Sequence, residues 1–293
     1  MSKSCFFTLL TNAGDINRIR LLVNSLRTFG GKFAETVFLI FTFGKPLAIF
    51  DDLPEIRQIP ISLPDCYRKI PFSAKIFTCA QAERIAIKEN IDSLIWIGSS
   101  AFFVQPPQQF DLEQSYSAAF RPVHHRNIGM PVETDLDDFW QGIYHFIGLK
   151  DDAHYVETFV ESEKIRPYFN SHLFAIAPPV GILQRWEEAF CCFIEEGFCR
   201  EEFCSDPLHR IFLHQALLSA LLLKHLPWES LRILSPEYSY PLHLHHQVPP
   251  EKQPLALNEL VCPVYEDTFH FPETLNGLKV DEPLAGWLKE RMI

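Results

Sequence analysis

Blocks of apolar and polar residues predict a strand, a helix and a second strand at the start of the chain. Residues 5–11 form an apolar, β-favouring run that ends at the polar sequence NAGD. Apolar residues then recur at helical spacing over 16–26, with Asp15 as the expected cap and Gly30 as the stop. Residues 36–42, TVFLIFT, are predicted to form a second, buried strand. This order predicts a βαβ unit, with parallel strands joined by a right-handed crossover.

The same alternation of elements continues through most of the chain. Uninterrupted apolar strands such as 93–97 indicate a sheet that is covered on both faces. We therefore predict an α/β protein, a single Rossmann-like domain whose mixed, mostly parallel central sheet is flanked by helices. Further strands are predicted at 56–61, 116–122 and 168–178, and further helices at 73–90, 135–149, 180–198 and 206–226.

The end of the chain has a different pattern. From residue 235 onward prolines are frequent and hydrophobic periodicity weakens. We expect residues 235–293 to be a C-terminal extension that packs over the domain. No internal repeat or linker divides the chain, so residues 1–293 are expected to form one domain.

Charge narrows the classes of partner. The chain of 293 residues has a formal net charge of -11 and contains no basic run, which argues against binding nucleic acid. A nucleotide-sized ligand stays compatible with this charge, because backbone amides and one Lys or Arg suffice to hold a diphosphate.

Targeting and redox signals point to the cytoplasm. The N-terminus lacks the apolar core and cleavage site of a signal peptide, and the longest apolar helical stretch is too short to span a bilayer. The eight cysteines are expected to be reduced thiols. The group formed by Cys191, Cys192, Cys199 and Cys204 does not follow Cys-x-x-Cys spacing.

Four segments carry a resemblance to a known family. They are FFTLLTN…LLVNSLRTFGG, PFSAKIFTCAQAE, SLIWIGSSAFFVQPP and PYFNSHLFAIAPP. In this order they resemble nucleotide-sugar glycosyltransferases of the A-type fold, nearest to the glycogenin-like and bacterial lipopolysaccharide hexosyltransferase branch. The resemblance covers most of residues 5–241. It implies an A-type glycosyltransferase fold and a nucleotide-diphosphate sugar as ligand.

The sequence departs from the family pattern where the chemistry is expected. Gly98 and Ser100 replace the two carboxylates of the metal-binding Asp-x-Asp motif. The family's Asp-Gln pair on a later helix corresponds to His214-Gln215, and His172 stands where the family often has a small residue. Glycine and serine offer only neutral oxygens, which are poor ligands for a divalent cation. The expected cofactor is therefore none, with manganese possible but not favoured, and restoring Asp at both 98 and 100 is expected to create manganese affinity.

The resemblance assigns roles to particular residues, each weighed against a structural alternative. The turn formed by Gly98, Ser99 and Ser100 is either a diphosphate cradle or an ordinary turn between strands. Asn170 and Ser171, beside His172, either bind sugar hydroxyls or satisfy local backbone groups. The turn of residues 98–100 and the segment of residues 170–171 are expected to line one cleft. Lys75 either reaches a phosphate or is a solvated lysine. The remaining candidates are Thr11 and Asn12 at the base site, and His214 and Gln215 as catalytic residues.

Metal sites elsewhere have weaker support. The sequence HLHH is expected to place two of His243, His245 and His246 on one face of a strand, and His270 matches a family histidine ligand. Neither set has a recognisable third or fourth ligand. Asp135, Asp137 and Asp138 form a carboxylate cluster that fits helix capping better than metal binding.

Two functions are therefore expected. The first is a glycosyltransferase that moves a hexose from a nucleotide sugar to an unknown hydroxyl acceptor, with little or no dependence on a divalent cation. The alternative is a catalytically inactive relative that keeps the fold as a binding or scaffolding protein. Walker, Gly-x-Gly-x-x-Gly, Gly-x-Ser-x-Gly and His-Glu-x-x-His motifs do not occur.

Overall fold

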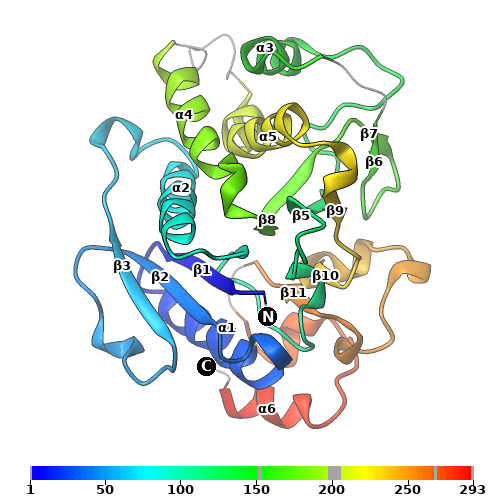
Figure 1. Cartoon of the computed structure of the whole chain (residues 1–293). Helices are drawn as coiled ribbons and strands as arrows, with labels where there is room; N and C mark the ends of the chain where they lie inside the picture. Colours follow the sequence, from blue (N-terminus) through cyan, green and yellow to red (C-terminus); the bar gives the residue numbers. More distant parts are fainter. Residues whose placement is uncertain (1, 151–153, 197–205, 267–268, 292–293) are drawn as a thin grey trace.

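A seven-stranded sheet forms the centre of the computed structural model, which describes residues 2–150, 154–196, 206–266 and 269–291 (Figure 1). The strand order is β3-β2-β1-β4-β8-β5-β9, and β8 is the one strand antiparallel to its neighbours. The prediction of an α/β protein with a mixed, mostly parallel sheet is confirmed. The strands are β1 (Ser4–Leu10), β2 (Val37–Phe43), β3 (Ile56–Ile61), β4 (Ser93–Ile97), β5 (Ala118–Pro122), β8 (Phe169–Ile176) and β9 (Leu231–Ile233).

Both faces of the sheet are buried, which explains the continuous apolar strands. In β4, Leu94 and Trp96 belong to one hydrophobic cluster, whereas Ile95 and Ile97 belong to another on the opposite face. Successive side chains of a strand point to opposite faces, so two-sided burial requires an apolar residue at every position.

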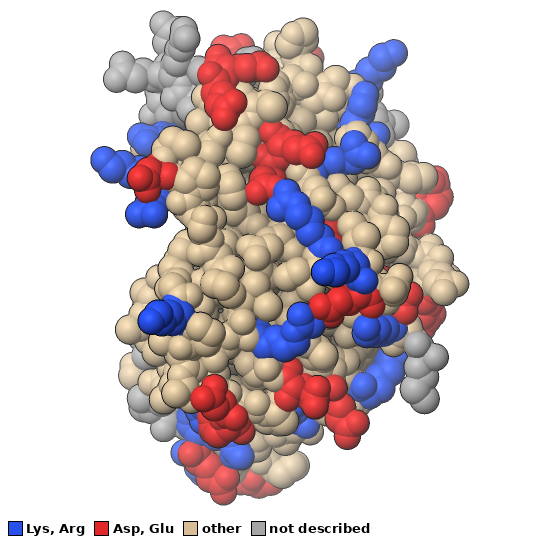
Figure 2. Space-filling model, turned by 60° about the vertical axis from the view of Figure 1, so that its left-hand side comes forward, with Lys and Arg blue, Asp and Glu red and all other residues tan. Residues whose placement is uncertain are grey.

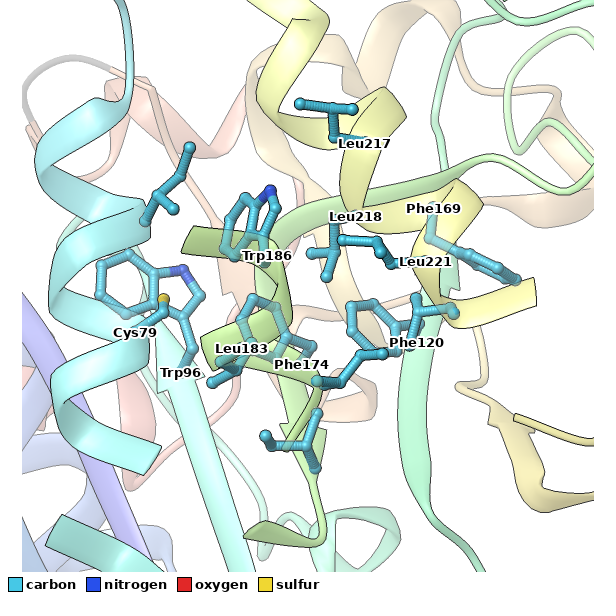
Figure 3. Close-up of a cluster of buried hydrophobic side chains, with 14 of the residues drawn as sticks. Cys79, Trp96, Phe120, Phe169, Phe174, Leu183, Trp186, Leu217, Leu218 and Leu221 are labelled. Atoms are coloured by element: carbon cyan, nitrogen blue, oxygen red, sulfur yellow. The ribbon is translucent and has the colours of Figure 1, made fainter. Parts of the chain in front are cut away.

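Helices on the two faces supply these clusters. Helix α1 (Asp15–Phe29) covers one face, and α2 (Ser73–Lys88), α4 (Ile182–Glu195) and α5 (Pro207–His225) cover the other (Figure 1). Helix α3 (Asp138–Ile147) packs on α5. Figure 3 shows Trp96 of β4 and Trp186 of α4 in the hydrophobic cluster between the sheet and these helices. Trp186 is fully buried, and shortening such a side chain to alanine costs about 3–5 kcal/mol.

The region after residue 235 packs against the domain through a third hydrophobic cluster. Tyr240, Leu257 and Tyr265 from this region pack with Phe102 and Val104, which follow β4. The apolar run that contains Phe102 does not form a strand; its backbone instead bonds to the C-terminal region. The short elements of the chain are β6 (Val156–Glu157), β7 (Lys164–Ile165), β10 (Tyr238–Pro241), β11 (Cys262–Val264) and α6 (Leu284–Arg291).

One prediction for the C-terminal region is wrong. The HLHH sequence lies in a 3₁₀ helix (Leu242–Gln247), not in a strand. His245 Nδ1 lies 2.7 Å from the hydroxyl of Tyr240, whereas His243 Nε2 lies 3.5 Å from a carboxylate oxygen of Glu266. The segment follows Pro241, which ends β10, and tight 3₁₀ turns point successive rings in different directions.

Two further sequence expectations concern thiols and membranes. The described cysteines are free thiols, whereas Cys199 and Cys204 lie outside the described residues. In the described part of the chain, no helix is both long and apolar enough to cross a membrane. On the face shown in Figure 2, basic and acidic side chains are intermixed.

Candidate functional site

The site begins where the strand order changes direction. From β1 the chain first builds β2 and β3 on one side and then crosses to β4 on the other. In open α/β sheets, ligands bind at the carboxyl ends of the strands beside such a switch point. Thr11 and Asn12 follow β1, and the turn of residues 98–100 follows β4.

Asp15 connects these two segments. Its carboxylate accepts hydrogen bonds from the backbone and hydroxyl of Thr11, from the amide of Asn12 at 3.1 Å, and from Ser99 Oγ at 3.3 Å. Asp15 is the first residue of α1, and Gly14, not Asp15, is in the capping position. The expected capping role is therefore wrong, because the carboxylate bonds to groups at the strand ends and lies 3.6 Å from the guanidinium of Arg18, and it accepts no capping hydrogen bond from the helix backbone.

Strand β8 brings the second group of predicted residues to the same place. Because β8 is antiparallel, its beginning lies beside the end of β4, and the amide of Gly98 donates to the carbonyl of His172 at 2.8 Å. A cavity of about 460 Å³ opens there. Six residues expected from the sequence line it: Lys75, Asn170, Ser171, His172, His214 and Gln215.

Lys75 lies on the wall of this cavity and is buried, so the alternative of a solvated lysine is wrong. Its ammonium donates to the backbone carbonyl of Ser171 and to Ser171 Oγ at 2.8 Å, and it lies 5.3 Å from the ring centre of Trp96. Among the described residues no carboxylate oxygen lies within 4 Å of it. Burial lowers the pKa of Lys75 to about 7.

His214 and Gln215 hold Ser171 in position. His214 Nδ1 lies 2.9 Å from the carbonyl of Ile211, so Nδ1 carries the proton and Nε2 accepts from Ser171 Oγ at 3.0 Å. The side-chain oxygen of Gln215 accepts from the backbone amide of Ser171 at 3.2 Å. Burial, with the positive Lys75 nearby, lowers the pKa of His214 well below its usual value. These contacts give both residues an orienting role around Ser171.

Gly98 and His172 fit together as a pair. A Cβ atom at position 98 would lie 2.6 Å from Cε1 and Nε2 of His172, so the ring occupies the space that a side chain at position 98 would need. Burial lowers the pKa of His172 to about 3, so its ring is neutral. His172 thus stands between the turn and the cavity, and residues 98–100 are not among the cavity-lining residues. Ser100 is buried, and its carbonyl accepts from the amide of Tyr265.

Some buried polar atoms at this cavity have no hydrogen-bond partner among the described residues; they include His172 Nε2, His124 Nδ1 and Ser239 Oγ. Buried polar atoms are nearly always paired, so unpaired ones around a cavity indicate a polar ligand. Sequence reasoning missed His124 and Ser239, since nothing local distinguishes them.

A second cavity of about 620 Å³ adjoins the first at Phe72, which lines both. Thr11, Phe43, Arg68 and Lys69 also line it. The ring of Phe72 stacks on the imidazole of His214, with centroids 4.1 Å apart. Phe72 has a left-handed backbone conformation (φ 61°), which is costly for a bulky residue. Strained backbone conformations of this kind are common at ligand sites.

The other metal candidates do not join this site as a ligand set. Within the described ranges, no group of three or more His, Cys, Asp or Glu side chains is arranged to hold a metal ion. His243 and Glu266 line the first cavity, whereas His245 and His246 do not. Asp137 caps α3 by accepting from the amide of Trp140 at 2.8 Å.

Comparisons with known proteins do not assign a family or a function to this site. No model of a known protein family matches the chain, and no curated protein matches it.

Proposed function

We propose that the protein binds a nucleotide-diphosphate sugar and transfers its hexose to a hydroxyl acceptor, with protein cations in place of a divalent metal ion. The donor would occupy the two adjoining cavities. Its base and ribose would lie near Phe43 and Phe72, and its diphosphate and sugar near Lys75. The order of the resembling segments and the position of the cavities beside the switch point support this arrangement.

One observation carries the proposal: among the described residues, the buried ammonium of Lys75 contacts only neutral groups. A cation in that setting lacks electrostatic compensation, and an anionic ligand would supply it. A phosphate oxygen beside Nζ would also raise the pKa of Lys75 above its value of about 7, so binding would take up a proton near neutral pH.

The same residues suit the leaving group of a transfer reaction. When the bond between the anomeric carbon and the diphosphate oxygen breaks, negative charge develops on that oxygen, while the acceptor oxygen bonds to the carbon. Lys75 in a low-dielectric wall would stabilise this charge, and Arg68 and Lys69 would attract the nucleotide. His172 and Ser239 would donate or accept hydrogen bonds with sugar hydroxyls.

Thermal shift with uridine and guanosine diphosphates, in manganese and in EDTA, tests the proposal. We expect at least one nucleotide to raise the melting temperature in both buffers. Lys75→Met should weaken the affinity by about 10- to 100-fold, the usual loss for a charged hydrogen bond. Lys88→Met, an exposed lysine of the same helix, should leave it unchanged.

The alternative function, a scaffolding protein, predicts the opposite result in the thermal-shift experiment. A scaffolding protein without a nucleotide site would show no shift with either nucleotide, and Lys75→Met would then affect stability alone. Stabilisation that requires manganese would instead overturn the metal-independent part of the proposal.

A further inference from the structure

A third cavity lies outside the site described above and shares no lining residue with it. It has a volume of about 530 Å³, within the range of small-molecule sites. It opens where β5 and β9 end, and its walls include Arg121, Trp228, Ile233 and Lys252. The exposed apolar side chains of Tyr155 and Ile233 both belong to these walls.

Arg121 is the unusual residue of this cavity. It is 5% exposed, and its Nε and Nη2 are buried with no hydrogen-bond partner among the described residues. In the described part of the chain no carboxylate lies within 4 Å of its guanidinium; Glu237 provides only a longer-range attraction. Its Cζ lies 4.8 Å from the centre of the ring of Phe159. A buried, unpaired cation is costly, and a single cation–π contact does not replace its hydrogen bonds.

Local backbone geometry holds the guanidinium there. The pairing of β5 with β8 shifts register between Phe120 and Arg121. Such irregularities re-aim a side chain and are common beside functional sites. The neighbouring cation is different, because Lys252 donates to Ser162 Oγ at 2.7 Å and to the carbonyl of Phe159 at 3.0 Å, and it pairs at 3.4 Å with the carboxylate of Glu157, which also lines the cavity. One cation of this cavity is therefore satisfied by the protein, and the other is left for a ligand.

We propose that this cavity binds a small organic anion, whose carboxylate or phosphate pairs with the guanidinium of Arg121 and whose apolar body lies against Trp228 and Ile233. A guanidinium is the side chain best suited to bind two oxygens of one carboxylate or phosphate group. The aromatic and aliphatic walls would bury the rest of the ligand. The site is independent of the nucleotide-sugar cavities.

The test uses calorimetric titration of the full chain with phenylacetate and phenyl phosphate at millimolar concentrations. Benzyl alcohol and inorganic phosphate serve as probes that lack the charge and the apolar body, respectively. We expect one of the two aromatic anions to bind, and its identity distinguishes a carboxylate from a phosphate ligand. Arg121→Met should weaken that binding roughly tenfold or more, and the matched variant Lys252→Met much less. Uridine diphosphate affinity should be unchanged in both variants, which separates this test from that of the proposed function.

Stability without ligand gives a second, independent readout. A structural arginine would lower the melting temperature when replaced, whereas removal of an unpaired buried cation should leave it unchanged or raise it. The proposal is overturned if neither aromatic anion binds, if inorganic phosphate binds as tightly as phenyl phosphate, or if Arg121→Met lowers the melting temperature without changing anion affinity.

Discussion

At the scale of single residues, Gly98 and His172 are complementary. The small residue after β4 makes room for the large ring on β8, so these two residues form one packing arrangement. Restoring Asp at 98 and 100 alone would force the ring to move, so the structure corrects the expectation that this double change is enough to create manganese affinity. We therefore expect manganese affinity only when His172→Gly accompanies both changes, and titration with manganese compares the double with the triple variant.

The packing itself can be measured with smaller changes. Gly98→Ala should destabilise the protein by about 1–3 kcal/mol, the usual cost of overpacking, because its methyl group would meet the His172 ring. In the His172→Ala background the same change should cost much less. Urea unfolding of the two single variants and the double variant gives the coupling energy. Additive effects would show that the ring does not occupy this space.

Lys75 should make stability depend on pH. Its pKa is about 7 in the folded protein and 10.5 in the unfolded chain, so the unfolded chain binds more protons between these values. Stability from this group is then fully present above about pH 10.5 and is lost as the pH falls toward 7. The free energy of unfolding should rise from pH 7 to 10 more steeply in the unmodified protein than in Lys75→Met. Equal slopes in the two proteins would contradict a buried Lys75 with a lowered pKa.

At the scale of elements, one carboxylate on α2 fixes the start of α4. Glu83 is fully buried and accepts from the amides of Leu183 at 3.1 Å and Gln184 at 2.8 Å. These amides are otherwise unsatisfied donors at a helix N-terminus, and burial raises the pKa of the carboxyl. Glu83 thereby links two helices that both form the wall of the large core.

Glu83→Ala should destabilise the protein by roughly 2–4 kcal/mol, since it leaves two buried amides unpaired. Glu83→Gln keeps an acceptor oxygen and should cost less. Arg84→Ala, which removes the neighbouring exposed ion pair with Glu187, should cost less than about 1 kcal/mol. Chemical denaturation ranks the three variants, and a larger loss for Arg84→Ala than for Glu83→Ala would contradict this assignment.

At the scale of the whole molecule, the C-terminal region shares its core with the segment that follows β4. Phe102 is fully buried among residues of that region, including Tyr265 and Phe269, with ring centres 6.1 and 5.1 Å away. We expect the described chain to unfold in one cooperative transition.

Phe102→Ala should lower the free energy of unfolding by about 3–5 kcal/mol and shift the whole transition. Circular dichroism in the far and near ultraviolet, followed during the same denaturation, should give coincident curves. If the C-terminal region were an independent unit, the curves would separate and the near-ultraviolet signal of its tyrosines would change first.

The sequence by itself determined the layers of this protein. Continuous apolar runs such as 93–97 require burial on both faces, and helical spacing at 73–90 supplies a cover; these are local patterns with a local cause. Only the tertiary structure decided the site. From the sequence, Lys75 is indistinguishable from a solvated lysine, and only the folded chain buries it beside Ser171. Gly98 is likewise indistinguishable from an ordinary turn residue, and only the fold places the ring of His172 next to it. Burial and unpaired hydrogen bonds arise between segments far apart in the chain, so no spacing rule in one segment reports them.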